Sequence, residues 1–164
     1  MVPGGDASAA KYVIRPATLT DAPFLASVSL IALVALREPP HDFDEDEWRQ
    51  GFISWTEEQV RGEVPFSTTS VIEVDGRPVG RLRVVRNRQH VELAGIQLLP
   101  EAQSRGIGSA IVESLKSEAA ALGIPFELSV EKDNPRARAL YERLGLSQVA
   151  DDGEELRYRW NSRG

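Results

Sequence analysis

The first third of the chain alternates between one short strand pattern and two helical patterns. Residues 11–15 (KYVIR) have the composition of a strand. The apolar run FLASVSLIALVAL predicts a helix from about residue 21 to residue 36, because the capping residues Thr20 and Asp21 precede it. A second helix is predicted within residues 41–60, since acidic residues open that segment and negative charge is favourable near a helix N-terminus.

Strand patterns follow in the middle of the chain. The segments VIEV and VGRLRVV flank an Asp-Gly dipeptide at 75–76, which is the strongest short-range signal for a β-hairpin. Leu82 and Val84 then fall on one face of the second strand, and Arg81 and Arg83 fall on the other. The hairpin therefore has one apolar face and one basic face.

A third strand, HVELAGIQLL, is predicted from about residue 90 to residue 99. Gly95 lies in its middle. A glycine there indicates a bulge, or the close approach of another backbone or a ligand.

Helices and strands alternate in the last third. A strand is predicted at 126–130 (FELSV), and Asn134 with Pro135 begins a helix that ends at Gly145. Two short strands follow near 147–150 and 154–160. A longer amphipathic helix precedes them, with Gly123 as its C-terminal cap and one apolar stripe formed by Ile107, Ile111, Leu115, Ala119 and Leu122.

This order of elements predicts an α/β fold. Three meandering strands joined to a βαβ unit give a mixed, mostly antiparallel central sheet flanked by helices. The 164 residues fit one domain, which we place at residues 11–164, after a flexible N-terminus at 1–10.

Composition and charge narrow the function classes. The net charge of −6 argues against nucleic acid as a partner, because phosphate backbones require clustered Lys and Arg, and it favours a cationic substrate. The chain has no cysteine and two histidines, so disulfides, a cysteine nucleophile and a metal site are not expected. No apolar run approaches the roughly 20 residues needed to span a bilayer, and the N-terminus has no signal-peptide pattern. We therefore expect a cytoplasmic protein with no membrane partner.

The most informative segment is the glycine-containing loop between the third strand and the amphipathic helix. A strand, a tight loop and a helix N-terminus together form an anion site, because free backbone N–H groups and the helix dipole converge there. Gly106 and Gly108 would let the backbone approach a phosphate closely, and Arg105 could contact its oxygens. Taken alone, the loop fits a helix start without a ligand equally well.

The surrounding sequence resembles the GNAT superfamily of N-acetyltransferases over roughly residues 11–160. In that family a Q/R-x-x-G-x-G/A loop holds the pyrophosphate of acetyl-CoA, and it matches here at Gln103, Gly106 and Gly108. Leu146 stands where the second family motif, N-x-x-A-x-x-L-Y-x-x-L-G-F, usually has Phe. The other positions of that motif match at Asn134, Ala137, Leu140, Tyr141, Leu144 and Gly145.

The resemblance implies transfer of an acetyl group from acetyl-CoA to a primary amine by direct attack in a ternary complex. It implies no metal and leaves a homodimer open. A bulge near Gly95 would separate the third strand from its neighbour FELSV and admit the thioester. The implied acetyl-CoA contacts are Ile96, Gln97, Leu98, Gln103, Ser104, Arg105, Gly106, Ile107, Gly108, Ser109 and Asn134.

The same resemblance implies a general acid and leaves the base open. Tyr141 matches the family residue that donates a proton to the CoA thiolate, although a helix tyrosine also serves for packing. Glu92 is the first candidate base, because it shares a strand face with Ile96 and apolar neighbours would raise the pKa of its carboxyl. His90 is the second candidate. Both could equally be solvated strand-end residues, with ordered water and backbone carbonyls acting instead.

The acceptor amine is not specified. Acidic residues at 42–47, with Trp48 and Trp55 nearby, would suit an ammonium group through charge and cation–π contact. The same residues fit a solvated helix start with tryptophans packed in the core. Two other functions remain open from the sequence: a CoA-binding sensor without turnover, and a structural domain with an empty loop.

Overall fold

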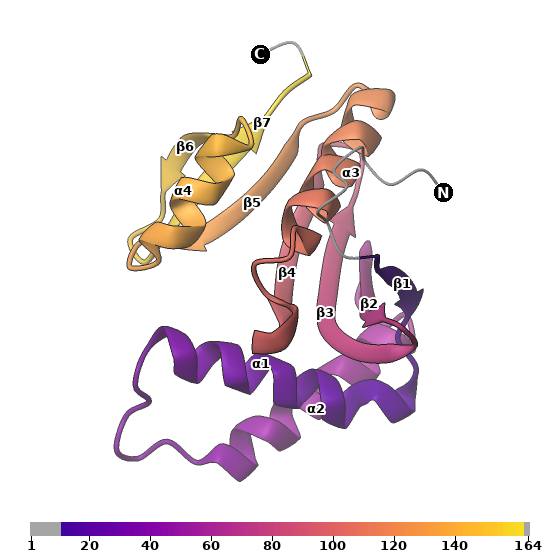
Figure 1. The fold of residues 1–164 in the computed structure, drawn as a ribbon, viewed down its shortest axis with the longest axis vertical. Helices are drawn as coiled ribbons and strands as arrows, with labels where there is room; N and C mark the ends of the chain where they lie inside the picture. The colour runs from indigo at the N-terminus through magenta and orange to yellow at the C-terminus, as the bar shows by residue number, and fades with distance from the viewer. Residues whose placement is uncertain (1–10, 163–164) are drawn as a thin grey trace. The chain divides into compact units, whose positions relative to one another are not determined.

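The computed structural model describes residues 11–162, so the expected flexible N-terminus at 1–10 lies outside the described residues. Strands pair in the order β1-β2-β3-β4-β5-β7-β6. The pairing is parallel between β4 and β5 and antiparallel for β1–β2, β5–β7 and β6–β7, which confirms the predicted mixed sheet (Figure 1). The strands are β1 (Val13–Pro16), β2 (Ser67–Val74), β3 (Arg77–Arg86), β4 (Val91–Leu98), β5 (Phe126–Glu131), β6 (Ser147–Asp151) and β7 (Glu155–Trp160).

Four α-helices and two 3-10 turns complete the described chain, close to the predicted positions. They are η1 (Leu19–Asp21), α1 (Ala22–Leu36), α2 (Glu45–Val60), η2 (Pro100–Ala102), α3 (Ile107–Leu122) and α4 (Pro135–Arg143).

The described residues divide into two compact units. The first, called the N-unit below, contains residues 11–83 and 95–107; the second, the C-unit, contains residues 84–94 and 108–162. Strands β3 and β4 each contribute residues to both units. The expectation of one domain at 11–164 stays a prediction.

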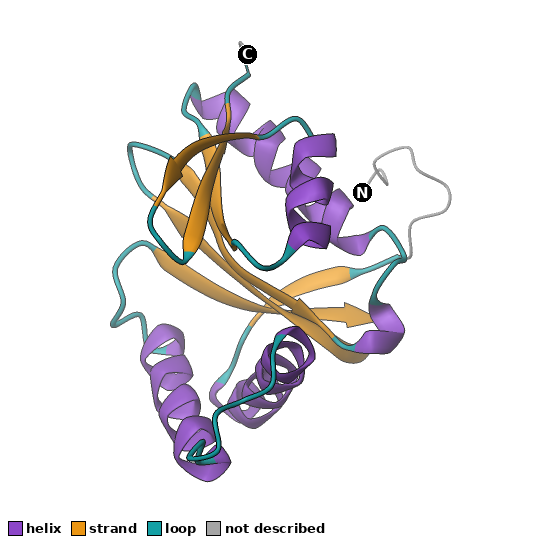
Figure 2. Ribbon diagram, turned by 90° about the vertical axis from the view of Figure 1, so that its left-hand side faces the viewer, coloured by secondary structure: helices purple, strands orange, loops and turns teal. Residues whose placement is uncertain are grey.

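In the N-unit, α1 and α2 lie side by side (Figure 1 and Figure 2). Their apolar side chains meet residues from the segment after β1 and from β2, so the apolar run seen in the sequence is a core helix face. The core cluster is formed by Ala17, Leu25 and Val71, with Phe24, Phe52 and Val60 packed against it.

The stretch Leu19–Leu36 corrects our reading of the apolar run. Its 18 residues have a mean hydropathy of 1.9, which by length and composition alone is enough to cross a membrane. A buried core helix passes the same test, and Leu25, Ala26 and Val28 of this stretch are completely buried. The expected cytoplasmic location and absence of a membrane partner therefore stay predictions.

The predicted hairpin is confirmed. Asp75 and Gly76 have φ values of 52° and 77°, as a type I′ turn requires at both central positions. Strand β1, which lies at the edge of the sheet beside β2, begins two residues later than predicted and includes Pro16. A proline fits there because β1 is an edge strand and needs no second ladder partner for its backbone nitrogen.

Arg15 joins the start of the N-unit to β2. Its guanidinium binds the Asp21 carboxylate at 2.8 Å and the Glu73 carboxylate at 2.7 Å. The hydrogen bond from Arg15 lowers the pKa of Asp21 to about 2, against the opposing effect of its burial. Asp21 also accepts the backbone N–H of Thr18, so it fixes the entry to α1 rather than capping that helix directly.

We expect Asp21→Asn to lower the free energy of unfolding by about 1–2 kcal/mol at neutral pH, since the ion pair with Arg15 is partly exposed. The folded-state pKa lies below the ordinary 3.8. This stabilisation is therefore present above about pH 4 and is lost as the pH falls through about 2. Urea denaturation from pH 2 to pH 7 measures it, with the exposed Asp42→Asn as control. Equal pH profiles for both variants would contradict the assignment.

In the C-unit, α3 presents the predicted apolar stripe with one exception. Ile111, Leu115 and Ala119 are buried as expected, but Leu122 is 61% exposed. Leu122 is the last residue of the helix, and Gly123 turns the chain away with a φ of 71°. The stripe therefore ends one turn earlier than the periodicity predicts.

Helix α4 has the predicted caps at both ends. The Asn134 side chain accepts the backbone N–H of Ala137 at 3.2 Å, and Gly145 has a φ of 93°. Lys116 of α3 donates to the carbonyl oxygen of Leu144 at 2.6 Å and lies 4.8 Å from the centroid of the Trp160 ring. This contact places a positive charge at the C-terminal end of α4, where the helix dipole favours it.

Candidate functional site

The glycine-containing loop follows β4 and η2 in the N-unit. Ser104 and Gly106 have φ values of 59° and 82°, so the backbone turns sharply before α3 begins at Ile107. The Gln103 side chain donates to the carbonyl oxygen of Leu98 at 3.0 Å, which fixes the start of the loop to the end of β4. The turn leaves the first N–H groups of α3 without partners inside the helix, as in an anion-binding helix start.

Gly108 lies in the first turn of α3, directly after the loop, and its surroundings are open. A Cβ added at this position would meet no atom within 4 Å, and its φ lies outside the left-handed region. Neither packing nor backbone conformation therefore requires glycine here, in the first turn of a helix where alanine is better tolerated. Open space beside a helix N-terminus fits the close approach of a phosphate, so the residues present fit the pyrophosphate of CoA.

The C-terminal half of β4 carries the residues expected to pair with the pantetheine arm, Ile96, Gln97 and Leu98, and all three are half-buried. Gly95 precedes them. A Cβ at Gly95 would lie 2.6 Å from Nη1 of Arg81, so the guanidinium in its present position leaves room only for glycine. The group that lies against Gly95 is thus a side chain of β3, and the expected bulge or approach of another backbone or a ligand stays a prediction.

In the C-unit, the parallel pairing of β4 with β5 extends over three residue pairs, from Val91–Phe126 to Leu93–Leu128. The splaying of the two strands beyond Gly95 stays a prediction.

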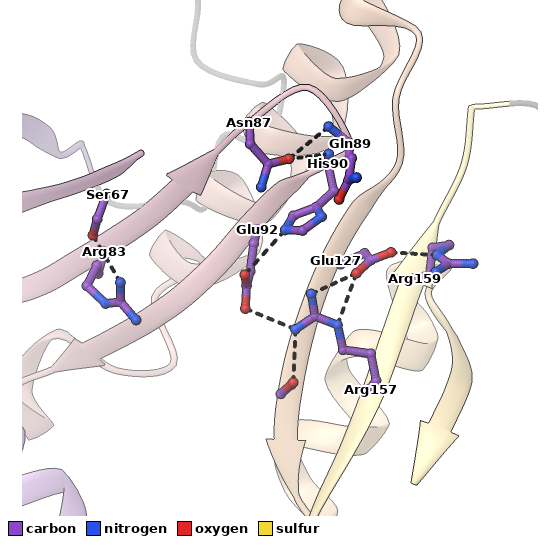
Figure 3. Close-up of polar contacts among 10 residues, drawn as sticks. Ser67, Arg83, Asn87, Gln89, His90, Glu92, Glu127, Arg157 and Arg159 are labelled. Carbon is purple, nitrogen blue, oxygen red and sulfur yellow. Dashed lines mark hydrogen bonds and ion pairs between the residues drawn. The ribbon is translucent and has the colours of Figure 1, made fainter. Parts of the chain in front are cut away.

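A row of charged side chains crosses β4, β5 and β7 in the C-unit (Figure 3). Glu92 lies opposite Glu127, and Glu127 lies opposite Arg159. Arg157 joins the two carboxylates: its Nη1 is 2.9 Å from Glu92, and its Nη2 is 2.7 Å from Glu127. His90 lies on the other side of Glu92, with 3.4 Å between Nε2 and Oε1.

The candidate base Glu92 is therefore surrounded by polar groups and not by the apolar neighbours that the strand pattern predicted. Arg157 fixes one carboxylate oxygen, and His90 faces the other. The geometry brings both candidate bases together as one pair. The role of either as base stays a prediction.

Glu127 is the buried centre of this row, and the prediction of a strand at 126–130 did not single it out. Its carboxylate accepts bonds from Arg159 at 2.6 Å and from Arg157 at 2.7 and 3.0 Å. Burial alone would raise the pKa of this carboxyl, but these hydrogen bonds hold it below its ordinary 4.5. Glu127 is consequently ionised at neutral pH.

Tyr141 lies on α4 of the C-unit and is half-buried. Burial raises the pKa of its hydroxyl. Within residues 11–162 the hydroxyl forms no hydrogen bond. A protonated phenol without a protein acceptor is suited to donate to another molecule.

Three more of the residues expected to contact acetyl-CoA lie at the start of α4 and around the start of α3. Asn134 uses its side-chain oxygen to cap α4, a function that the sequence pattern also assigned to it. Arg105 and Ser109 lie on either side of Gly106, Arg105 exposed and Ser109 half-buried. Among the described residues, no group of three or more His, Cys, Asp or Glu could hold a metal ion. The expected absence of a metal stays a prediction.

Trp48 and Trp55, which would suit an ammonium group or pack in the core, both have neighbours within the N-unit. The Trp55 ring lies 4.9 Å from the guanidinium carbon of Arg83 and 5.4 Å from that of Arg81. Trp48 instead stacks on Phe52, with 5.1 Å between ring centroids. The cation–π contact predicted for Trp55 is therefore made by the protein's own arginines.

Comparison with known proteins identifies the class to which this fold and loop belong. The family described as "Acetyltransferase (GNAT) family" matches residues 30–146, which is well over half of the chain. The chain belongs to the GNAT acetyltransferase family.

Solved structures agree in fold. PaiA N-acetyltransferase from Thermoplasma acidophilum, in complex with coenzyme A, has a TM-score of 0.74 at 16% identity, covering 92% of this chain and 99% of that chain. An acetyltransferase from Thermus thermophilus has a TM-score of 0.67 at 21% identity, covering 92% of this chain and 97% of that one.

A curated relative is similar over part of the chain. Mycothiol acetyltransferase of Clavibacter michiganensis is 35% identical over 77 residues, which is 47% of this chain and 24% of that protein's length. The matched segment thus spans about a quarter of the relative.

Proposed function

We propose that this protein transfers an acetyl group from acetyl-CoA to a primary amine, by direct attack in a ternary complex. The observation that carries the proposal is Gly108, a helix-start glycine that neither packing nor backbone conformation requires. Family membership supports the use of an acyl-CoA donor. The acceptor is a small molecule or a peptide.

The chain's own residues divide the work of binding. The backbone of Ile96 to Leu98 would pair with the pantetheine arm as an added strand does, and the loop from Gln103 to Ser109 would bind the pyrophosphate. Bound acetyl-CoA supplies the activated acetyl group. Asn134 would contact the cofactor through the part of its side chain that does not cap α4.

Two proton transfers remain for side chains. A primary amine is mostly protonated at neutral pH, so a base must remove a proton before it can attack. Glu92, paired with His90, takes that role directly or through water. Tyr141 donates its hydroxyl proton to the departing CoA sulfur, and its raised pKa keeps that proton in place until then. The unbonded hydroxyl favours catalysis over the alternative of a CoA-binding sensor.

Gly108→Ala separates ligand binding from folding. We expect it to leave the free energy of unfolding unchanged or raise it by up to about 1 kcal/mol, since alanine is the better helix former. We expect the Kd for CoA to rise about tenfold or more, because the added methyl occupies the space that the phosphate approaches. Gly51→Ala is the matched control: Gly51 is also helical, with nothing within 4 Å of its Cβ position.

Calorimetry with CoA and thermal unfolding measure the two effects. Equal CoA affinity for both variants and the wild type would contradict the assignment of the loop.

The activity itself is tested with acetyl-CoA, a panel of amines and a thiol-reactive dye. The protein has no cysteine and adds no background to the released CoA thiol. Amine-dependent thiol release is the expected result. Tight CoA binding with no release for any amine would favour the sensor, and no CoA binding at all would overturn the proposal.

A further inference from the structure

Arg81 is an unusual residue for the interior of the N-unit. It is 4% exposed, and its Nε is buried without a hydrogen-bond partner. Its Nη1 donates to Oε1 of Gln97 at 2.9 Å, and that neutral amide is its hydrogen-bond acceptor within residues 11–162. No carboxylate of the described chain pairs with it. A buried charge in this state costs stability.

A second arginine, Arg83, makes the buried positive charge of Arg81 less favourable. Arg83 lies two residues along the same strand and on the same face. Burial lowers the pKa of Arg81 to about 10, and the charge of Arg83 adds to that effect. The cationic groups thus repel each other in a partly dehydrated environment.

The contacts described for the two arginines include aromatic rings and neutral polar side chains. Phe52 and Trp55 of α2 lie 5.0 and 5.4 Å from the guanidinium carbon of Arg81. Arg83 donates to the Ser67 hydroxyl at 3.0 Å (Figure 3), and Ser67 donates to Oε1 of Gln59. Nε2 of Gln59 is, like Nε of Arg81, buried without a partner. The guanidinium cluster, defined as Arg81, Arg83, Ser67 and Gln59, therefore has two unused donors.

We propose that the guanidinium cluster binds an oxyanion carried by the acceptor, so that the substrate is an amine that also bears a carboxylate or a phosphate. An oxyanion would accept the unused hydrogen bonds of Arg81 and Gln59 and offset the buried charge of Arg81, and a guanidinium matches its geometry. The proposal rests on the acetyl-transfer function proposed above. It adds an anionic group to the ammonium substrate that the acidic segment at 42–47 would suit.

The position of the cluster suits an acceptor. Arg81 contacts Gln97 through its hydrogen bond and approaches Gly95 closely. Gln97 belongs to the strand segment assigned to the pantetheine arm, and Gly95 directly precedes that segment. The half-buried Phe52 and Trp55 cover Arg81, and these are the side chains that give way when a ligand reaches it.

Arg81→Met tests the cluster against a purely structural role, with the exposed Arg77→Met on the same strand as control. Amino acids are compared with their C-terminal amides, and phosphoethanolamine with ethanolamine, in the thiol-release assay. In the wild type we expect the acid of a pair to exceed its uncharged partner in kcat/KM about tenfold or more. If only the amino acids are preferred over their amides, the oxyanion is a carboxylate. If only phosphoethanolamine is preferred over ethanolamine, it is a phosphate.

For Arg81→Met we expect the acceptor KM to rise about 10- to 100-fold and the preference to disappear, while the KM for acetyl-CoA is unchanged. The thermal midpoint should be equal to or above that of the wild type, because an uncompensated buried charge has been removed. Arg77→Met should match the wild type in every measurement. A lower midpoint with the preference retained would assign Arg81 to structure and overturn the proposal.

A binding measurement keeps this proposal separate from the acetyl-transfer proposal. Thermal shift with the same acids and amides, without CoA, reports on the cluster alone, and protection by acids that is absent in Arg81→Met supports it. If CoA binds and amides react as well as acids, acetyl transfer stands and the oxyanion site is wrong. If CoA does not bind, the acetyl-transfer proposal fails, and the thermal shift still decides whether the cluster binds an oxyanion.

Discussion

Tyr141→Phe should lower kcat by about 10²–10⁴-fold, the usual contribution of a general acid. The substitution removes one hydroxyl, and within residues 11–162 that hydroxyl has no hydrogen-bond partner to lose. Stability and CoA affinity should therefore remain at the wild-type level. Steady-state thiol release, calorimetry with CoA and thermal unfolding measure the three quantities.

Tyr158→Phe is the matched control in the same unit. Tyr158 is completely buried, and its hydroxyl donates to Glu142 at 2.8 Å. Its loss should lower the free energy of unfolding by about 1 kcal/mol and leave kcat unchanged. A Tyr141→Phe enzyme with full kcat would remove Tyr141 from the mechanism, and a fall in kcat for both variants would point to a packing effect.

The pH dependence of kcat provides a further check on Tyr141. Burial raises the pKa of its hydroxyl above the ordinary 10. A general acid acts only while protonated, so loss of activity from this group should begin above pH 10 and not near neutrality. An alkaline decline that begins between pH 7 and 9 would have to come from another group.

Glu127→Gln should lower the free energy of unfolding by about 3–5 kcal/mol, because it leaves Arg157 and Arg159 without their shared buried carboxylate. The control is Glu113→Gln, which breaks an exposed pair with Lys116 in the same unit and should have little effect. Urea denaturation measures both. A loss below about 1 kcal/mol for Glu127→Gln would show that the arginines find other acceptors.

The sign of the pH effect follows from the lowered pKa of Glu127. Its unfolded-state value is near 4.5 and its folded-state value lies below that. The stabilisation is therefore fully present above pH 4.5 and is lost as the pH falls through the folded-state pKa. The wild type should lose stability below pH 4.5 more steeply than Glu127→Gln does.

Local patterns were sufficient for most of the fold. The helix at 107–122 was predicted, since its apolar period and the following Gly123 are both local signals. The hairpin at 75–76 depends on two positive φ values that an Asp-Gly pair readily adopts. Such elements are encoded within a few residues, and they were predicted correctly.

The charged interior could not be predicted in the same way. Alternation along β3 placed Arg81 on a polar face and gave no sign that this face is covered by Phe52 and Trp55 of α2. Glu127 looked like a single polar residue in an apolar strand, because its partners come from β7, 30 and 32 residues further along the chain. Contacts between distant segments decide burial, and a single sequence does not reveal them.

In the candidate site, too, local signals were predictive and contacts between distant segments were not. The glycine loop and Tyr141 were identified from motifs, whereas the polar surroundings of Glu92 depend on Arg157, 65 residues away. The pattern of strand faces is local and placed Glu92 correctly on β4. The chemical character of its neighbours required the register of three strands.

The two edges of the sheet have a consequence for the behaviour of the protein at high concentration. Edge strand β1 has four residues and includes Pro16, while edge strand β6 has a register shift between Gln148 and Ala150. Short strands, prolines and bulges interrupt the row of free backbone groups onto which a further strand could add. Both edges are thus protected against strand-by-strand aggregation, and deleting Val149 to straighten β6 would remove that protection on one side.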